Sequence, residues 1–174
     1  MSPDALNTIV MDLMASVTTM TLATCRQNTP RATDLYFAND KLDLVFFSSA
    51  DAEHSRNLAA NENCSATVHP PVSGWKEIKG IRVEGIAHPV DDASLKIRAQ
   101  DAYLRKFPFA AQFLSPPTRA DQSTNRSAAG AVTLYLLRVS GLTYIDNSLG
   151  FGTKYFTPVS DGEFAGIPAR NQKS

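Results

Sequence analysis

Residues 42–58 read LDLVFFSSADAEHSRNL, an apolar segment that runs directly into two hydroxyl residues and then into a polar stretch. Apolar residues alternate with others along its first half, and both faces turn apolar at Phe46 and Phe47. This pattern is expected of a strand in the wall of a barrel that is also covered on its outside. The polar stretch 51–61 is predicted to be a short helix with Leu58 as its main apolar contact.

The sequence on either side of this segment predicts further short strands joined by turns. Strands are expected at 17–25, 31–38, 41–47, 64–68, 78–90, 131–139 and 142–146, and flanking helices at 2–17 and 92–107. Gly80 and Gly85 suggest bulges in the long strand, and Ser140-Gly141 predicts a hairpin turn. Short turn-linked strands favour a barrel or sandwich over a parallel α/β sheet. One domain is expected over residues 1–157, followed by a flexible tail at 158–174.

Composition and charge exclude several classes of function. Lys and Arg number 17, as do Asp and Glu, so the formal net charge is zero and the basic excess of a duplex-binding protein is missing. No run of apolar residues is long enough to span a membrane. Asp4 stands where a signal peptide needs positive charge. Cys25 and Cys64 make no disulfide framework, so a cytoplasmic location is expected, with neither nucleic acid nor membrane as a partner.

No self-sufficient catalytic or metal-binding motif occurs, so catalytic residues remain unassigned from the sequence and no metal is expected. The segment that can bind a ligand is the one quoted above. Ser48 and Ser49 end its strand, and His54, Ser55 and Arg56 begin its helix. Hydroxyls, free amides at a helix start and a guanidinium together suit a phosphate dianion. The alternative is a capped turn followed by a solvated helix.

Several stretches and their order resemble a known superfamily. These are TLATC (21–25), RATDLYFA (31–38), LDLVFFSS (42–49), HSRNLAANENCSATV (54–68) and IKGIRVEGIAHPV (78–90). Together they resemble the pyridoxamine 5'-phosphate oxidase-like, FMN-binding split-barrel superfamily. Within it, RKFPFAAQFLS (105–115) and YIDNSLGFGTK (144–154) are similar to a small bacterial family. The resemblance covers roughly residues 8–156.

The resemblance implies a mainly β protein with flanking helices, built on a six-stranded antiparallel split β-barrel. It also implies a homodimer with FMN in a groove between the two chains. The isoalloxazine would lie beside Arg31, Ala32, Thr33, Asp34 and Leu35, and the phosphate beside Ser48, Ser49, His54, Ser55 and Arg56. The partner chain would contribute its 147–154 segment, with Gly150, Gly152 and Lys154. Trp75 would either approach the ring system or anchor its loop against the barrel.

Two departures from the superfamily pattern bear on the function. His54 stands where many members carry lysine, and residues 118–129 look like an insertion that is either a lid or a disordered loop. The expected function is that of an FMN-binding flavoprotein, a flavin-dependent oxidoreductase acting on an unidentified small molecule. The alternatives are a flavin protein without turnover of its own, or a split barrel that holds haem, a deazaflavin or nothing.

Overall fold

The structure, a computed structural model, describes residues 1–111 and 132–171 of the chain. Its helices are α1 (Pro3–Ser16), α2 (Glu53–Ala60) and α3 (Ala93–Lys106), with short 3-10 turns η1 (Trp75–Glu77), η2 (Pro108–Ala110) and η5 (Asn147–Leu149). Its strands are β1 (Thr19–Arg26), β2 (Thr29–Tyr36), β3 (Ala38–Asp40), β4 (Asp43–Ser49), β5 (Asn63–Val68), β6 (Lys79–Pro89), β7 (Val132–Asp146), β8 (Lys154–Ser160), β9 (Glu163–Phe164) and β10 (Ala169–Arg170). None of the described helices is long and apolar enough to cross a membrane.

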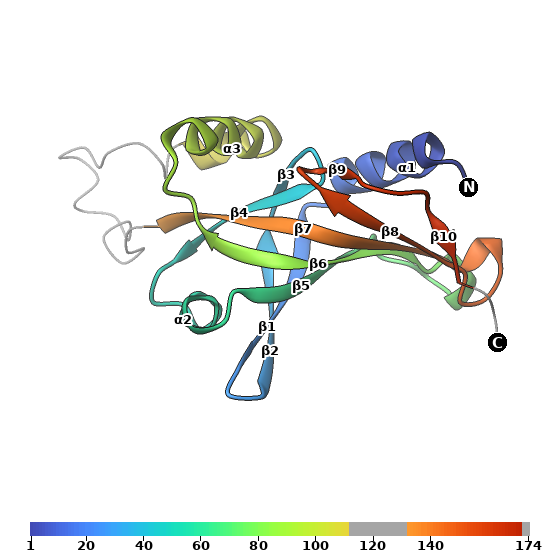
Figure 1. The fold of residues 1–174 in the computed structure, drawn as a ribbon, viewed down its shortest axis with the longest axis horizontal. Coiled ribbons are helices and arrows are strands. Elements are labelled where there is room, and N and C mark those ends of the chain that lie inside the picture. The colour runs from blue at the N-terminus through green and yellow to red at the C-terminus, as the bar shows by residue number, and fades with distance from the viewer. Residues whose placement is uncertain (112–131, 172–174) are drawn as a thin grey trace.

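The strands form one curled antiparallel sheet in the order β10-β8-β7-β6-β5-β1-β2, and β4 pairs with β7. β7 pairs with β6 along most of its length, with β4 through its first half and with β8 through its second half. Figure 1 shows the β1–β2 hairpin crossing the long strands steeply, with α2 beside it and with α1 and α3 on the opposite side. Among the described strands β2 and β4 are not hydrogen-bonded to each other, so the barrel of β2, β1, β5, β6, β7 and β4 stays split. The predicted six-stranded antiparallel split β-barrel is confirmed, with four further strands attached.

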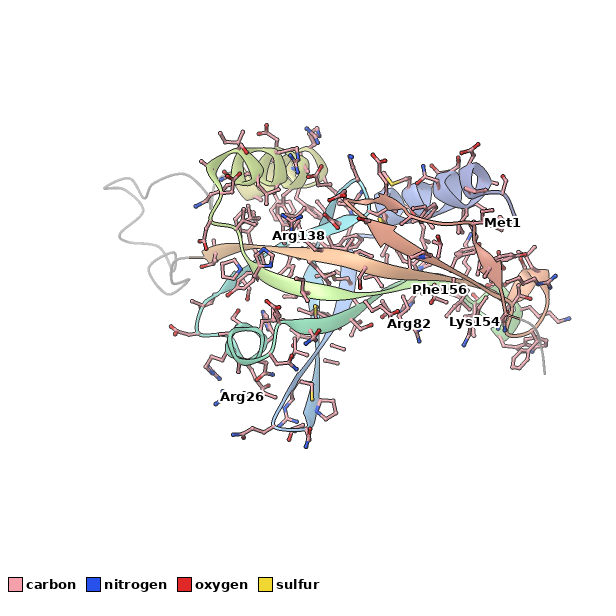
Figure 2. All side chains as sticks on the ribbon, in the orientation of Figure 1. Met1, Arg26, Arg82, Arg138, Lys154 and Phe156 are labelled. Atoms are coloured by element: carbon pink, nitrogen blue, oxygen red, sulfur yellow. The ribbon has the colours of Figure 1, made fainter. Side chains whose placement is uncertain are left out.

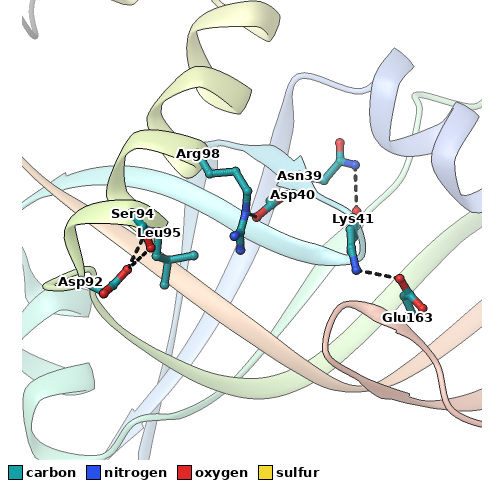
Figure 3. Close-up of polar contacts among 8 residues, drawn as sticks. All are labelled: Asn39, Asp40, Lys41, Asp92, Ser94, Leu95, Arg98 and Glu163. Carbon is teal, nitrogen blue, oxygen red and sulfur yellow. Dashed lines mark hydrogen bonds and ion pairs between the residues drawn. The ribbon is translucent and has the colours of Figure 1, made fainter.

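The core explains why both faces of β4 are apolar. Phe46 points into the main cluster, which α1 closes at one end with Leu6, Val10 and Met14. Val45 points the other way, into a second cluster beneath α3. α3 is fixed over this outer face by the ion pair between Arg98 and Asp40, whose Nε and Oδ2 lie 2.6 Å apart (Figure 3). The structure therefore confirms that β4 is a strand of the barrel wall that is covered on its outside.

The predicted hairpin at Ser140-Gly141 is wrong, because β7 runs through these residues without a turn. The β6–β7 register shifts between Glu84, which pairs with Gly141, and Gly85, which pairs with Val139, so the irregularity expected at Gly85 is present, but its extra residue is Ser140 of β7. The bulge expected at Gly80 is not found, because Gly80 pairs with Ile145 in regular register. A Cβ at Gly85 would lie 1.9 Å from the Arg138 carbonyl oxygen, so glycine is required there by close backbone approach. The Ser140-Gly141 pair thus marks a bulge in β7 and not a turn.

The segment after residue 157, expected to be a loosely attached tail, continues the sheet. β8 extends to Ser160, and the Asp161-Gly162 turn, with positive φ at both residues, brings β9 back onto it. β10 pairs with the start of β8, and the Asn171 side chain accepts a hydrogen bond from the Lys154 amide at 2.8 Å. The insertion expected at 118–129 lies outside the described residues.

Candidate functional site

β2 carries the five residues expected beside the isoalloxazine, and it is the last strand of the sheet. One of its edges pairs with β1, while among the described strands none pairs with the other edge. Arg31 stands opposite Thr24 of β1, so alternation places it with Thr33 and Leu35 on one face of the strand. Ala32 and Asp34 point to the other face. The free edge offers a row of unpaired N–H and C=O groups to a ligand or a partner chain.

Ser48 and Ser49 meet the start of α2 in a compact polar cluster. The Ser48 hydroxyl lies 2.5 Å from Nε2 of His54, and the Ser55 hydroxyl donates to the Ser49 carbonyl at 2.7 Å. The Ser49 hydroxyl accepts from the Asp51 amide at 3.3 Å. The hydroxyls of Ser48, Ser49 and Ser55 therefore lie close together, as the sequence predicted. Each of them also makes an internal hydrogen bond that shapes the turn from strand to helix.

His54 faces the interior of this cluster. Its side chain is 7% exposed, and burial lowers its pKa, opposed by the nearby Glu53 carboxylate. The neutral form of its imidazole is therefore favoured, with Nε2 against Ser48.

α2 begins without a side-chain cap. Its N-cap is Ala52, whereas α1 and α3 begin with the capping side chains of Ser2 and Asp92. Within the described residues, no acceptor is found for the amides of Glu53, His54 and Ser55. Such amides, at the positive end of the helix dipole, favour an anion.

A pocket of about 230 Å³ lies between α2 and the β1–β2 hairpin. It is lined by Arg26, Gln27, Thr29, Arg31, Glu53, Arg56 and Asn57, and we call it the arginine pocket. The register of the β1–β2 hairpin explains how the pocket forms. Thr24 and Arg26 share a face of β1 with Arg31 of β2, and the Asn57 amide donates to the Thr24 hydroxyl at 3.1 Å, which fixes α2 over that face.

The arginine pocket is rich in positive charge. Three guanidinium groups line it, and the single carboxylate among its lining residues is that of Glu53, whose Oε1 lies 3.0 Å from Nε of Arg31. Arg56 donates to the Asp51 carbonyl oxygen, which is neutral. By contrast, a larger pocket beside α1, of about 430 Å³, contains the oppositely charged Lys41–Glu163 pair. Sequence reasoning missed Arg26, whose place beside Arg31 follows from the hairpin register alone.

The remaining expected residues gather at the other end of the long strands. The Trp75 and Phe151 rings meet edge to face, with centroids 5.5 Å apart, and are 55% and 66% exposed. We call this pair the aromatic knob. Gly150 and Gly152 have φ angles of 125° and 72°, which side chains rarely adopt, and they let the loop turn on either side of Phe151.

Asn147 holds the aromatic knob in place. Its buried side chain donates to the Trp75 carbonyl at 2.8 Å and accepts from the Gly152 amide at 3.0 Å. Its backbone amide also donates to the Ile78 carbonyl at 2.9 Å. The knob is thus exposed but fixed. No pattern in the sequence indicated the role of Asn147.

Within one chain the expected residues fall into two groups. Figure 2 places Arg26 beside α2 and the β1–β2 hairpin, and Lys154 at the far end of the long strands. The first group contains the β2 residues, the two serines of β4 and the start of α2. The second contains Trp75, the two loop glycines and Lys154. A site that uses both groups needs a second chain.

Comparison with known proteins agrees with this architecture. A family model described as pyridoxamine 5'-phosphate oxidase matches residues 8–133. No curated protein matches the chain.

Several solved structures share the fold. A haem-binding protein from Mycobacterium smegmatis superposes with a TM-score of 0.66 at 21% identity, covering 86% of this chain and 57% of that one, so the chain spans little more than half of its length. General Stress Protein 26 from Bacillus anthracis gives 0.59 at 17% identity, covering 88% and 98%. A FAD-binding protein from Mesorhizobium loti gives 0.58 at 17% identity, covering 79% and 91%.

Proposed function

The chain belongs to the pyridoxamine 5'-phosphate oxidase-like split-barrel superfamily, and from that premise we propose that it is an FMN-binding flavoprotein with oxidoreductase activity. Flavins bind to members of this superfamily, and one structural neighbour is described as FAD-binding. What we propose beyond the family is that the flavin is FMN, that the protein is an oxidoreductase and that it forms a homodimer.

The arginine pocket is the observation that carries the proposal. It combines three guanidinium groups, one carboxylate and the uncapped start of α2. Its net charge of two positive units is opposite to that of a phosphate monoester dianion, which is the group that distinguishes FMN from riboflavin. Arg31 and Arg56 would bind the phosphate, and free backbone amides of α2 would add hydrogen bonds.

The adjacent edge of β2 suits the ring system. From Arg31 to Leu35 its free N–H and C=O groups match the polar edge of an isoalloxazine, much as they would match another strand. Bound FMN supplies hydride chemistry, while the chain holds and orients it and excludes water. We assign no acid or base to the reaction.

A second copy of the chain completes the proposed site. The aromatic knob lies too far along the sheet to reach the arginine pocket of its own chain, as Figure 1 shows for η1, η5 and α2. Exposed aromatic rings fixed in one conformation are typical of interface anchors. In a homodimer, the knob of one chain would contact the flavin held by the other.

The absorbance spectrum of the purified protein tests this function. We expect the two visible bands of an oxidised flavin, and FMN on release by denaturation. A Soret band would instead favour haem, which the Mycobacterium smegmatis neighbour is described as binding. A spectrum that shows neither group, together with no binding of added FMN, would contradict the proposal. Turnover of a nicotinamide reductant with an acceptor then tests the oxidoreductase activity.

A further inference from the structure

We propose that Glu53 is an internal competitor of the ligand phosphate in the arginine pocket. Its carboxylate holds Arg31 when no ligand is bound, and a phosphate monoester binds by taking Arg31 from it. The inference rests on the proposed function, which it deepens by naming what regulates the affinity of that site. It also assigns Arg26, the third guanidinium of the pocket, to the phosphate.

The hydrogen bonds of Arg31 support this competition. Its Nε donates to Oε1 of Glu53 at 3.0 Å, and one terminal nitrogen donates to the Pro30 carbonyl at 3.2 Å. A guanidinium binds phosphate best through two parallel donors on one edge. The edge that contains Nε is the one that Glu53 occupies, so a bidentate phosphate contact there requires the carboxylate to leave.

The exposure of the pair makes the exchange feasible. The side chains of Arg31 and Glu53 are 48% and 57% exposed, so either can change rotamer without breaking the packing around it. Exposed ion pairs of this kind contribute little net free energy. The carboxylate therefore leaves at a small cost, but that cost is subtracted from the affinity of the ligand.

The other two guanidinium groups give the phosphate its remaining partners. Within the described residues, the guanidinium of Arg26 has neither a hydrogen-bond acceptor nor a carboxylate partner. Among the same residues, the guanidinium of Arg56 bonds only to a backbone carbonyl. With Glu53 present the pocket carries two net positive charges. That balance favours a monoester dianion over a carboxylate or a phosphodiester, each of which carries a single negative charge.

A simpler role for Glu53 makes a different prediction. Glu53 is the acidic residue in the first turn of α2, where it interacts favourably with the helix dipole. If that were its whole function, removing its charge would lower the stability of the helix and weaken every ligand equally. A competitor instead changes the affinity for phosphate alone, and in the direction of tighter binding.

The test is Glu53→Gln, titrated with FMN and with riboflavin at low salt. We expect FMN to bind about 1.5- to fivefold more tightly and riboflavin to bind as before, since only FMN displaces the carboxylate. The matched control is Glu163→Gln, which removes a somewhat more exposed ion pair with Lys41 at 2.6 Å in another part of the surface (Figure 3). It should alter neither affinity. Unchanged or weaker FMN binding, or an equal gain for riboflavin, would overturn the inference.

Inorganic phosphate separates this inference from the proposed function. If the wild type binds no FMN, phosphate is titrated while the Nε–H resonance of Arg31 is followed by NMR. A shift of that resonance, reached at lower phosphate concentration in Glu53→Gln, would support the competition although the flavin proposal had failed. No shift in either protein, or the same midpoint in both, would overturn the inference.

Discussion

The arginine pocket and the aromatic knob differ in almost every physical property. The pocket is charged, and its guanidinium groups outnumber its carboxylates by three to one. The knob is apolar, and its two rings are more than half exposed although Asn147 holds them fixed. Each is a surface that is costly to leave without a partner, the first because of unbalanced charge and the second because of exposed apolar area.

The difference fits the proposal that each region is half of a site. An anionic group needs the first region, and a flat apolar ring system needs the second. One chain keeps the two at separate ends of its sheet (Figure 1), so in the proposed site a ligand with both features would contact two chains.

The largest effect is expected at the aromatic knob. Trp75→Ala combined with Phe151→Ala should weaken dimerisation by about 4 kcal/mol, roughly a thousandfold, because buried aromatic anchors dominate interface energies. Sedimentation equilibrium measures the dissociation constant. Since both rings are exposed in the single chain, the fold should persist in the far-UV circular dichroism spectrum.

The control for this variant is Ile97→Ala, which removes another strongly exposed apolar side chain on α3. It should leave the dimer intact. If both variants weakened the dimer equally, the interface would not be centred on the knob. The loss would then follow from removing any exposed apolar side chain.

The next largest effect is expected in the arginine pocket. Arg56→Ala should weaken FMN by about 1.5–3 kcal/mol, or about 10- to 150-fold, because it removes a charge-assisted contact with phosphate. Riboflavin has no phosphate and should bind as it does to the wild type. Fluorescence titration of both ligands checks this, and equal losses for the two would show that Arg56 has a structural role only.

Asn147→Ala should have a smaller effect, confined to the knob. It leaves the Trp75 carbonyl and the Gly152 amide without their partner, at a cost of about 1–2 kcal/mol in the free energy of unfolding. Trp75 is the only tryptophan of the chain, so its fluorescence anisotropy reports on the knob directly. We expect lower anisotropy in the variant; an unchanged value would mean that Asn147 does not restrain the ring.

The smallest effect concerns His54 and pH. Because burial lowers the pKa of His54 in the folded protein, the unfolded chain takes up the proton first as pH falls. Its contribution to stability is therefore present above about pH 6.5 and is lost as pH falls from there toward the folded-state pKa. His54→Gln should reduce this loss of the free energy of unfolding with falling pH. For a single group the loss cannot exceed about 1.4 kcal/mol per pH unit. Urea unfolding between pH 7.5 and 5.5 compares the two slopes, and parallel slopes would refute burial of a neutral imidazole.

Much of the fold could be predicted because local pattern and tertiary structure agree. The two apolar faces of residues 44–47 correctly indicated a strand covered on both sides, and the break at Gly85 correctly indicated a bulge. The turn expected at Ser140-Gly141 failed because Ser140 is the extra residue of a β-bulge, and a Ser-Gly pair at a bulge resembles a turn in sequence. The strands after 157 were missed because each is short and depends on pairing with β8 rather than on its own pattern.

The candidate site was predictable only in part. Ser48, Ser49 and the start of α2 are close in sequence, so their meeting follows from one strand and one turn. The place of Arg26 depends on hairpin register, and the inward orientation of His54 depends on packing. Neither the register nor this packing produces a periodic pattern in the sequence. The hydrogen bond from Asn147 to the Trp75 carbonyl was also not predictable, because it joins residues far apart in the chain.

Mixing two defective variants tests the central claim, that each site combines the arginine pocket of one chain with the aromatic knob of its partner. Arg56→Ala and Trp75→Ala are each titrated with FMN alone and then as an equimolar mixture after subunit exchange. A mixed dimer has one site with both defects and one site with neither, so about a quarter of all sites should regain wild-type affinity after random exchange. No recovery in mixed dimers that mass spectrometry shows to have formed would contradict the account, because pocket and knob would then act within one chain or not act together.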